Sequence, residues 1–442
     1  MQKTVIAPFK PYIYNTDKIK FDEVTAPPYD VISKELQDAL HKRSEYNIIR
    51  LILGKENNDD SPADNKYIRA DELLNKWSRE NILIREPEEA IYLYLQGFTS
   101  EGKKYERIGF ISLFKLPEQK ENSQIFGHEK TLAKPKEDRL KLMEATKANL
   151  SSIFSIFEDN DKSIVNFITD SIENRNACKI SEFADDKNET HKLYRIVDKN
   201  LIDFVKMKME DKSIYIADGH HRFETCLNFR NYIKSAGSNN EKINADYCMM
   251  YFAPINQEGM IILPTHRCII NKKIKLENFI NEIEKNFTVI QSDAQNIVND
   301  LNKNKDNSSF GFIHESGKYF VISLKDTVKN TIDNPLERLD VSILQNYIFK
   351  NILHMEQSDI DNQRFIIYEK DALNAINSIS GKNNTCNNNN KQEKIEAVFL
   401  MNPTKIEDVT KIASLNLRMP QKSTFFYPKI ISGLTINVMY DL

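Results

Sequence analysis

The sequence has 442 residues, of which 40% are hydrophobic and 28% charged, so it holds enough apolar material for a packed core and predicts two or three domains. Its 61 basic and 64 acidic side chains leave a net charge of -3, which argues against binding to nucleic acid or to an anionic membrane. No apolar run approaches the roughly 18 residues of a membrane helix, and five scattered cysteines without a CxxC pair predict reduced thiols in a cytoplasmic protein.

The first 120 residues alternate between strand and helix patterns. Apolar runs predict strands at 5–9, 47–53, 91–96 and 105–114. The last two are expected to form a hairpin with Gly97–Lys104 at its tip. This stretch is not interpreted as a phosphate-binding P-loop, because a P-loop requires a helix after it and none is predicted here. Ser33 is the expected N-cap of a short helix, and Ser61-Pro62 predicts the start of a second helix with Leu74 and Trp77 on its apolar face.

The rest of the chain mixes strands and helices in the same way. Residues 212–233 predict a strand, a tight turn and a helix, and 246–255 with 260–270 predict a pair of strands. Further helices are expected near 162–175, 199–209, 275–285 and 338–353, with a strand near 191–197, a hairpin at 309–324, and short strands at 364–368 and 395–400.

These elements together predict an α+β fold of mixed sheets with helices, rather than a doubly wound parallel sheet. We expect three regions. Residues 1–120 form an N-terminal α/β region, 121–270 a motif-rich region, and 271–442 a C-terminal α+β region that closes the site. The asparagine-rich stretch 383–390 is expected to be a solvated loop.

The sharpest local motif is Asp218-Gly219-His220-His221-Arg222, between a predicted strand and a predicted helix. Gly219 lets the backbone turn and approach a ligand, and the first N–H groups of a helix have no intrahelical acceptor. The helix dipole and the Arg222 guanidinium would attract an anion, and phosphate is the commonest anion at such a position. The plain alternative is an ordinary N-cap by Asp218, with both histidines on the surface.

A second polar segment is Gly127-His128-Glu129-Lys130-Thr131, which precedes a predicted helix. Leu132 stands where an HExxH zinc-protease motif needs its second histidine, so that class is excluded. The flanking apolar residues are expected to turn the polar groups of this segment towards a pocket.

A third segment, Met419–Lys429, is bounded by prolines and places Lys422, Ser423 and Thr424 where they can contact a phosphate. The alternative is a loop that enters a core strand. Lesser candidates are expected in structured loops that also form site walls: Asp30, His266 and Arg267.

The same motifs also allow a zinc interpretation. Its nitrogen and oxygen ligands would come from His128, His220, His221 and His266 with Asp218 or Glu129. Adjacent histidine side chains diverge, however, and the sequence contains no pair of histidines at the i, i+4 spacing of a helix. A phosphate site therefore ranks above a zinc site.

In combination, these motifs resemble the family known as domain of unknown function 1015. The resemblance rests on Pro27–Ile32, Gly127–Glu129, Asp218–Arg222 and Met419–Thr424, in this order, and covers nearly the whole chain. Asp218–Arg222 also resembles the phosphate-binding motif of the ParB/sulfiredoxin superfamily, above all that of free-serine kinases. The resemblance implies a ParB/sulfiredoxin-like core within the α+β fold.

The resemblance further implies a kinase that transfers phosphate from ADP or ATP, with Mg²⁺, to free L-serine or a similar hydroxy compound. By this resemblance Asp218 becomes a metal ligand or base, and His220 is catalytic as well as phosphate-binding. Glu129 is assigned as general base from the composition of its segment rather than from the resemblance. The implied phosphate ligands are Gly219, His220, His221, Arg222, Lys422, Ser423 and Thr424. The residues assigned to the substrate are Asp30, His128, Thr131, His266 and Arg267.

Two alternatives stay open from the sequence. One is a ParB-like, nucleotide-dependent DNA-binding protein, against which the net charge argues. The other is a nucleotide hydrolase or phosphatase that uses the same anion site with water. The expected partners are a nucleotide and a small-molecule substrate, and a homo-oligomer is left open. Asp30, Glu129, Asp218 and Lys422 are expected to line one cleft.

Overall fold

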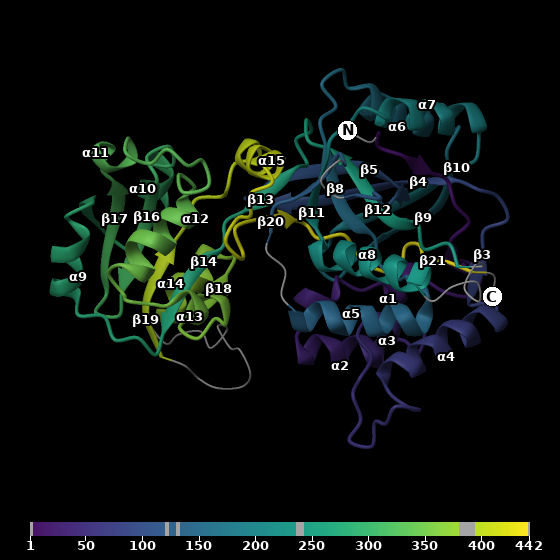
Figure 1. Cartoon of the computed structure of the whole chain (residues 1–442), viewed down its shortest axis with the longest axis horizontal. Helices are drawn as coiled ribbons and strands as arrows, with labels where there is room; N and C mark the ends of the chain where they lie inside the picture. The colour runs from purple at the N-terminus through teal and green to yellow at the C-terminus, as the bar shows by residue number, and fades with distance from the viewer. Residues whose placement is uncertain (1–2, 120–122, 130–132, 236–242, 380–393, 441–442) are drawn as a thin grey trace. The chain divides into compact units, whose positions relative to one another are not determined.

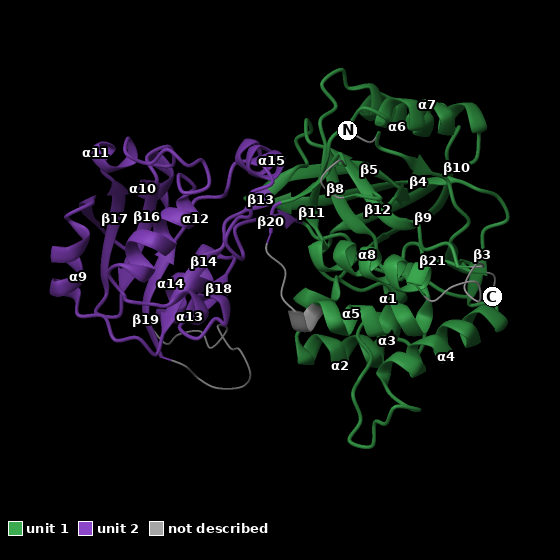
Figure 2. Ribbon diagram, in the orientation of Figure 1, with its two compact units in different colours: residues 1–127, 131–261, 428–442 green, residues 128–130, 262–427 purple. Residues whose placement is uncertain are grey.

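The computed structural model describes residues 3–119, 123–129, 133–235, 243–379 and 394–440. The chain divides into two compact units, coloured green and purple in Figure 2. Unit 1 comprises Met1–Gly127, Thr131–Ile261 and Pro428–Leu442, and unit 2 comprises His128–Lys130 and Ile262–Tyr427. The three regions expected from the sequence stay a prediction.

Unit 1 is built on a mixed sheet with the strand order β6-β11-β8-β12-β5-β4-β10-β9, and β1 also pairs with β5 (Figure 1). β11 runs parallel to β6 and antiparallel to β8, whereas β12 runs parallel to β8 and antiparallel to β5. This mixture confirms the predicted α+β class. The strands are β1 (Ile6–Ala7), β4 (Ile91–Ser100), β5 (Lys103–Lys115), β6 (Ile125–Gly127), β8 (Ile153–Phe157), β9 (Cys178–Ala184), β10 (Thr190–Ile196), β11 (Ile214–Asp218) and β12 (Tyr247–Pro254).

Helices cover both faces of this sheet. Figure 1 shows α6 and α7 on one side and α8 on the other, and α8 packs in turn against α5 and α5 against α4. Buried phenylalanines such as Phe110, Phe167, Phe223 and Phe252 belong to one continuous core between these layers. The helices of unit 1 are α1 (Phe21–Val24), η1 (Tyr29–Val31), α2 (Lys34–Arg43), α3 (Ile49–Ile52), α4 (Lys66–Arg79), α5 (Ala133–Thr146), α6 (Ser163–Glu173), α7 (Lys199–Met209) and α8 (His220–Ser235).

Helix starts in unit 1 follow side-chain capping. Ser33 accepts the N–H of Leu36, which confirms its predicted role as N-cap of α2. The predicted start of the second helix at Ser61-Pro62 is wrong, because Asn65 caps α4 instead. The apolar run 47–53, predicted as a strand, contains α3, and its apolar side chains are nearly all buried. A short run buried on all sides has no periodicity that separates helix from strand.

Strand pairing was predicted well only within hairpins. β4 and β5 form the expected hairpin, with Glu101 and Gly102 at positive φ in its turn. The predicted pairing of 246–255 with 260–270 is wrong, since β12 lies between β5 and β8 in the sheet of unit 1. The smaller pairs of unit 1 join β2 (Tyr12–Tyr14) to β3 (Leu83–Arg85), and β7 (Ala148–Asn149) to β21 (Asn437–Val438).

Unit 2 has a second sheet with the strand order β15-β17-β16-β19-β14-β18. Its neighbouring strands are antiparallel, and the hairpin expected at 309–324 is confirmed by β16 and β17. The strands are β14 (His266–Ile270), β15 (Phe287–Ser292), β16 (Ser309–His314), β17 (Lys318–Leu324), β18 (Ile366–Glu369) and β19 (Ile395–Leu400), with β13 (Ile261–Leu263) paired to β20 (Phe425–Tyr427).

Aromatic side chains join α9 to the sheet of unit 2, where the Phe279 ring packs against Phe312 and Phe399 at tilted angles. Residues of α10 and α14 pack into a separate cluster with strands of the same sheet. The helices are α9 (Leu276–Ile283), α10 (Ile297–Lys303), α11 (Asp326–Lys329), α12 (Asp340–Ile343), the π-helix η4 (Leu344–Lys350), α13 (Gln357–Asp361), α14 (Ala372–Ile379) and α15 (Ile406–Ser414). In the described part of the chain, no helix combines the length and the apolar character needed to cross a bilayer.

Candidate functional site

The turn between β11 and α8 has the geometry that the sequence predicts. Gly219 has φ +91°, a left-handed conformation that glycine adopts readily. The first intrahelical bond runs from the Phe223 N–H to the Gly219 carbonyl at 3.0 Å. The N–H groups of His220, His221 and Arg222 therefore precede the helical ladder and lie at the positive end of the helix dipole. His220 is buried and His221 half-buried, which differs from the surface histidines of the plain alternative.

The Asp218 carboxylate lies at the centre of this turn and contacts two cations. Arg222 donates from Nη2 to Oδ2 at 2.6 Å, and Lys429 donates from Nζ to Oδ1. The three side chains are only 10–12% exposed. Arg222 is also anchored through Nη1 to the carbonyl of Ser152. An anion placed here would meet two positive groups and one negative group, in surroundings where water screens little.

Lys429 reaches Asp218 because the segment after β20 is fixed to the sheet of unit 1. Arg107 on β5 donates to the carbonyl of Pro428 at 2.6 Å, and Gln96 on β4 donates to the carbonyl of Lys429 at 3.0 Å. Arg107 is fully buried, and this burial lowers the pKa of its guanidinium. The candidate from this segment in the sequence was Lys422, so Lys429 is a residue that sequence reasoning missed.

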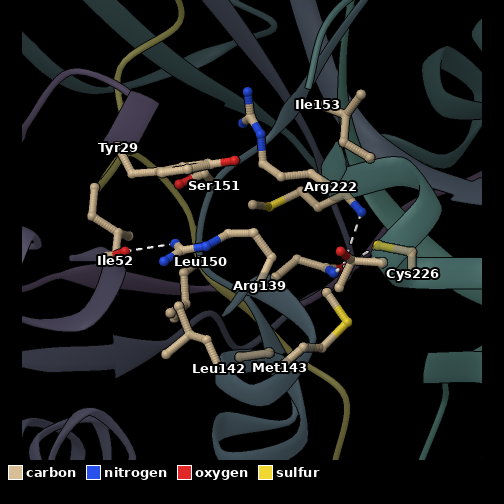
Figure 3. Close-up of a pocket in the computed structure, with 14 residues that line it drawn as sticks. Tyr29, Ile52, Arg139, Leu142, Met143, Leu150, Ser151, Ile153, Arg222 and Cys226 are labelled. Carbon is tan, nitrogen blue, oxygen red and sulfur yellow. Dashed lines mark hydrogen bonds between the residues drawn. The ribbon is translucent and has the colours of Figure 1, made fainter. Parts of the chain in front are cut away.

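A small cavity in unit 1 adjoins the Arg222 side chain. It measures about 50 Å³, on the order of a few water molecules. Figure 3 shows Tyr29, Ser151, Arg139 and Arg222 among the residues around it. The Pro27–Ile32 motif and the Asp218–Arg222 motif therefore meet here, through Tyr29 rather than through Asp30, which is exposed.

Tyr29 and Arg139 form a stacked pair in the wall of this cavity. The Arg139 guanidinium lies 4.1 Å from the centre of the Tyr29 ring and donates to the Ile52 carbonyl at 2.6 Å. Burial raises the pKa of Tyr29 to about 12, although the charge of Arg139 acts in the opposite direction. Tyr29 is thus a neutral hydrogen-bonding group near neutral pH. Tyr29 belongs to the Pro27–Ile32 motif, but neither residue was assigned a role in the site from the sequence.

The other candidate residues gather in unit 2. His128 Nε2 lies 2.9 Å from Thr424 Oγ1, and the N–H of Met419 donates to the His128 carbonyl at 2.7 Å. Glu129, which is half-buried, forms a parallel bridge with Met419. The second and third sequence motifs are therefore joined to each other. Thr131 lies outside the described residues.

His266 and Arg267 support this same part of unit 2. Arg267 donates to the carbonyl of Lys422 at 3.2 Å and to that of Thr265. His266 accepts the N–H of Met401 through Nδ1 at 3.0 Å. Ser423 donates to the Pro420 carbonyl at 2.6 Å. These contacts give each of the three candidates a structural role, and their roles towards a substrate stay predictions.

The four residues expected to line one cleft belong to two different units. Asp30 and Asp218 belong to unit 1, whereas Glu129 and Lys422 belong to unit 2. That they line one cleft stays a prediction.

Comparison with known proteins gives a family match and distant structural likenesses. The family model described as "Protein of unknown function (DUF1015)" matches residues 6–342. No curated protein matches the chain. A conserved hypothetical protein from Pyrococcus furiosus is similar to it at 12% identity and a TM-score of 0.34, with 71% of this chain and 92% of that chain covered.

Two further solved structures are similar at the same level. A free serine kinase in complex with AMP has 12% identity and a TM-score of 0.35, covering 71% of this chain and 89% of its own. A C-terminally truncated SbnI from Staphylococcus aureus has 8% identity and a TM-score of 0.33, covering 71% and 84%. TM-scores this low give no argument for a function, so a proposal has to rest on the residues of this chain.

Proposed function

The chain belongs to the DUF1015 family of proteins of unknown function, and from this premise we propose that it is a nucleotide-dependent phosphotransferase. It binds the phosphates of ADP or ATP at the turn between β11 and α8 and transfers a phosphoryl group to a small hydroxy compound. The observation that carries the proposal is the contact of Arg222 and Lys429 with one buried carboxylate at the start of α8.

This arrangement supplies what phosphoryl transfer needs. The transferred group is stabilised mainly by positioned positive charge rather than by covalent chemistry of the protein. Arg222 offers a planar fork for phosphate oxygens, Lys429 offers a compact ammonium group, and the first N–H groups of α8 point along the helix dipole. A bound phosphate would share the two cations with Asp218.

Asp218 does not fit the magnesium-ligand role that the resemblance implies. Oδ1 contacts the ammonium group of Lys429 and Oδ2 contacts the guanidinium of Arg222, so both oxygens already face positive charge. A divalent cation there would have to displace at least one of them. In our proposal Asp218 holds the two cations in place, and no step depends on a metal at this residue.

The choice of acceptor and of general base rests on the sequence motifs. The resemblance of Asp218–Arg222 to the free-serine kinase motif supports L-serine as the first acceptor to test. Glu129 is proposed as the general base that takes the proton of the acceptor hydroxyl, because a carboxylate is suited to this transfer. His128, with its link to Thr424, is proposed to orient the substrate.

Nucleotide binding tests the first half of the proposal. Calorimetric titration with ADP and ATP should show binding to the wild-type chain, and Arg222→Gln should weaken it about 10- to 100-fold, the range for a hydrogen bond to a charged group. Lys234→Gln, on the same helix but exposed and paired with Glu118 and Asp246, is the matched control. Equal affinity in Arg222→Gln and wild type would remove the phosphate site from this turn.

Transfer of labelled phosphate tests the second half. Single-turnover reactions with labelled ADP or ATP should yield a phosphorylated product from L-serine or another member of a panel of small hydroxy compounds. Release of phosphate to water alone would favour the hydrolase, and a shift of DNA at low salt would favour the ParB-like alternative. A chain that binds nucleotide but transfers phosphate to neither acceptor nor water would end the enzymatic proposal.

A further inference from the structure

The hairpin turn between β9 and β10 contains a second cluster of side chains with a chemistry of its own. The strands pair antiparallel, and residues 185–189 connect them. Asp185 Oδ1 accepts the N–H groups of Lys187 and Glu189, each at 2.9 Å, so this oxygen is used to shape the turn. The other oxygen, Oδ2, lies 3.7 Å from His191 Nε2 at the start of β10.

Asp185, Glu189 and His191 each offer one donor atom, and the three atoms lie within 4.8 Å of one another. In the described part of the chain this is the one such group of histidine, cysteine and carboxylate side chains. Glu189 is 5% exposed and His191 is fully buried. Two carboxylates brought this close repel each other, and a cation between them would lower that repulsion.

The His191 ring gives the second, independent observation. Its Nε2 atom is buried and has no hydrogen-bond partner, which is unusual for a buried polar atom, and it lies on the Asp185 side of the ring. Its Nδ1 atom lies 2.7 Å from the hydroxyl of Tyr94 on β4, whose ring is stacked on the imidazole. If Nδ1 carries the proton and donates it to Tyr94, the lone pair of Nε2 points at the carboxylates.

This is the arrangement of a metal-binding histidine. Such histidines donate their second ring N–H to an outer acceptor, which fixes the tautomer and the orientation of the ring. The Tyr94 hydroxyl, 2.7 Å from Nδ1, is placed to be that acceptor. Asp185 is 26% exposed, which leaves an entry path and a coordination position for water.

We propose that Asp185, Glu189 and His191 bind a divalent first-row transition metal ion, with Zn²⁺ as the first ion to test. One imidazole nitrogen with two carboxylate oxygens suits zinc better than magnesium or calcium, which take oxygen ligands almost exclusively. Bonds of about 2.0–2.2 Å place two ligands of one ion roughly 3–3.5 Å apart, so small side-chain movements close the site.

The site is independent of the proposed nucleotide site. All three ligands come from one hairpin, and the histidines considered for zinc from the sequence do not belong to it. A bound ion ties the turn to the first residues of β10 and stabilises the edge of the unit 1 sheet, where β9 is the last strand. A metal ion that binds the folded chain but not the unfolded chain raises the stability of the fold by mass action.

Three variants separate a metal site from a merely structural cluster. Asp185→Asn removes the charge but keeps an oxygen that can accept the two N–H bonds of the turn. Glu189→Gln removes the charge of the second carboxylate and keeps the shape of its side chain. Asp186→Asn is the control in the same turn, because Asp186 is exposed and pairs with Arg43. His191→Gln is less decisive, since a fully buried residue can be needed for folding.

The experiment uses the full chain without an affinity tag, freed of metal with a chelator. Titration with Zn²⁺ alone should give one bound ion per chain and a higher unfolding temperature, and Co²⁺ should give a visible spectrum of a site with nitrogen and oxygen ligands. Asp185→Asn and Glu189→Gln should each weaken Zn²⁺ binding at least tenfold, with Asp186→Asn unchanged. Absence of stoichiometric binding, or equal affinity in Asp185→Asn and Asp186→Asn, would overturn the proposal and leave the cluster a structural part of the turn.

Discussion

The ammonium group of Lys429 lies against one oxygen of Asp218 while the Arg222 fork lies against the other. Replacement of Lys429 by methionine keeps most of the buried stem and removes the charge. We expect Lys429→Met to weaken ADP and ATP binding about 10- to 100-fold in calorimetry, in line with a charged hydrogen bond. Lys422→Met is the matched control and should leave the affinity unchanged. If Lys422→Met weakened binding and Lys429→Met did not, the phosphate site would lie at Lys422, the residue that the sequence favoured.

Glu129 is the residue on which the transfer step of the proposal depends. Glu129→Gln has nearly the same shape and cannot take a proton, so we expect kcat to fall by 10²–10⁴-fold, the usual effect of losing a general base. Nucleotide affinity should stay close to that of the wild type. Single-turnover rates and separate binding titrations measure the two effects, and full activity of the variant would exclude Glu129 as the base.

The sequence identified those site residues whose partners are close along the chain. Asp218 and Arg222 lie four positions apart across a strand–glycine–helix turn, and both could be predicted from that pattern. Lys429 lies 211 positions from Asp218, and nothing in its spacing distinguishes it from Lys422. The pairing of Tyr29 with Arg139 was not predicted for the same reason, because it joins η1 to α5.

At the scale of elements, Gly219 determines how β11 leads into α8. A Cβ atom there would lie 2.9 Å from Nε and Nη2 of Arg222, and φ is +91°. We expect Gly219→Ala to lower the free energy of unfolding by about 1–2 kcal/mol, the cost of a left-handed backbone for an L-residue, and to weaken nucleotide binding by displacing the Arg222 fork.

Gly102→Ala separates these two effects. Gly102 also has positive φ, at +77°, but nothing lies within 4 Å of the added Cβ. Denaturant unfolding should show a similar loss of stability in both variants, whereas titration should show weaker nucleotide binding in Gly219→Ala alone. Equal affinity in the two variants would contradict the role of the Gly219 turn in phosphate binding.

Elements with regular periodicity were predictable, and their distant partners were not. The β11–α8 turn, the β4–β5 hairpin and the capped start of α2 follow from local patterns. The 47–53 run was predicted as a strand although it contains α3, because burial on all sides leaves it no period that separates helix from strand. β12 was assigned the wrong partner because pairing with β5 and β8 depends on segments far away in the sequence.

At the scale of the whole molecule, the stability of the chain should depend on the protonation of His266 in unit 2. Burial, and then the charge of Arg267, lower the pKa of His266 from 6.5 to about 4. The folded chain thus favours the neutral ring, and the stability that this provides is present above pH 6.5 and is lost as the pH falls towards 4. A shift of this size corresponds to about 3 kcal/mol.

His266→Asn is the variant that tests this dependence. Its amide oxygen can still accept the Met401 N–H that Nδ1 accepts in the wild type, but it does not titrate. Urea unfolding between pH 7 and pH 4.5 should show a smaller loss of stability in the variant than in the wild type. The same slope in both proteins would mean that other groups cause the acid sensitivity.

Unit 1 contains residues from both sides of unit 2 in the sequence, and this has a consequence for the order of events during translation. Asp218 leaves the ribosome 211 residues before Lys429, a delay of about 10–40 s at typical elongation rates. By the end of that interval the nascent chain holds the main sheet of unit 1, α8 and all of 262–427, while its proposed phosphate site still lacks one of the two cations. A premature stop at residue 428 would therefore release a chain that is nearly complete but binds nucleotide more weakly at this turn.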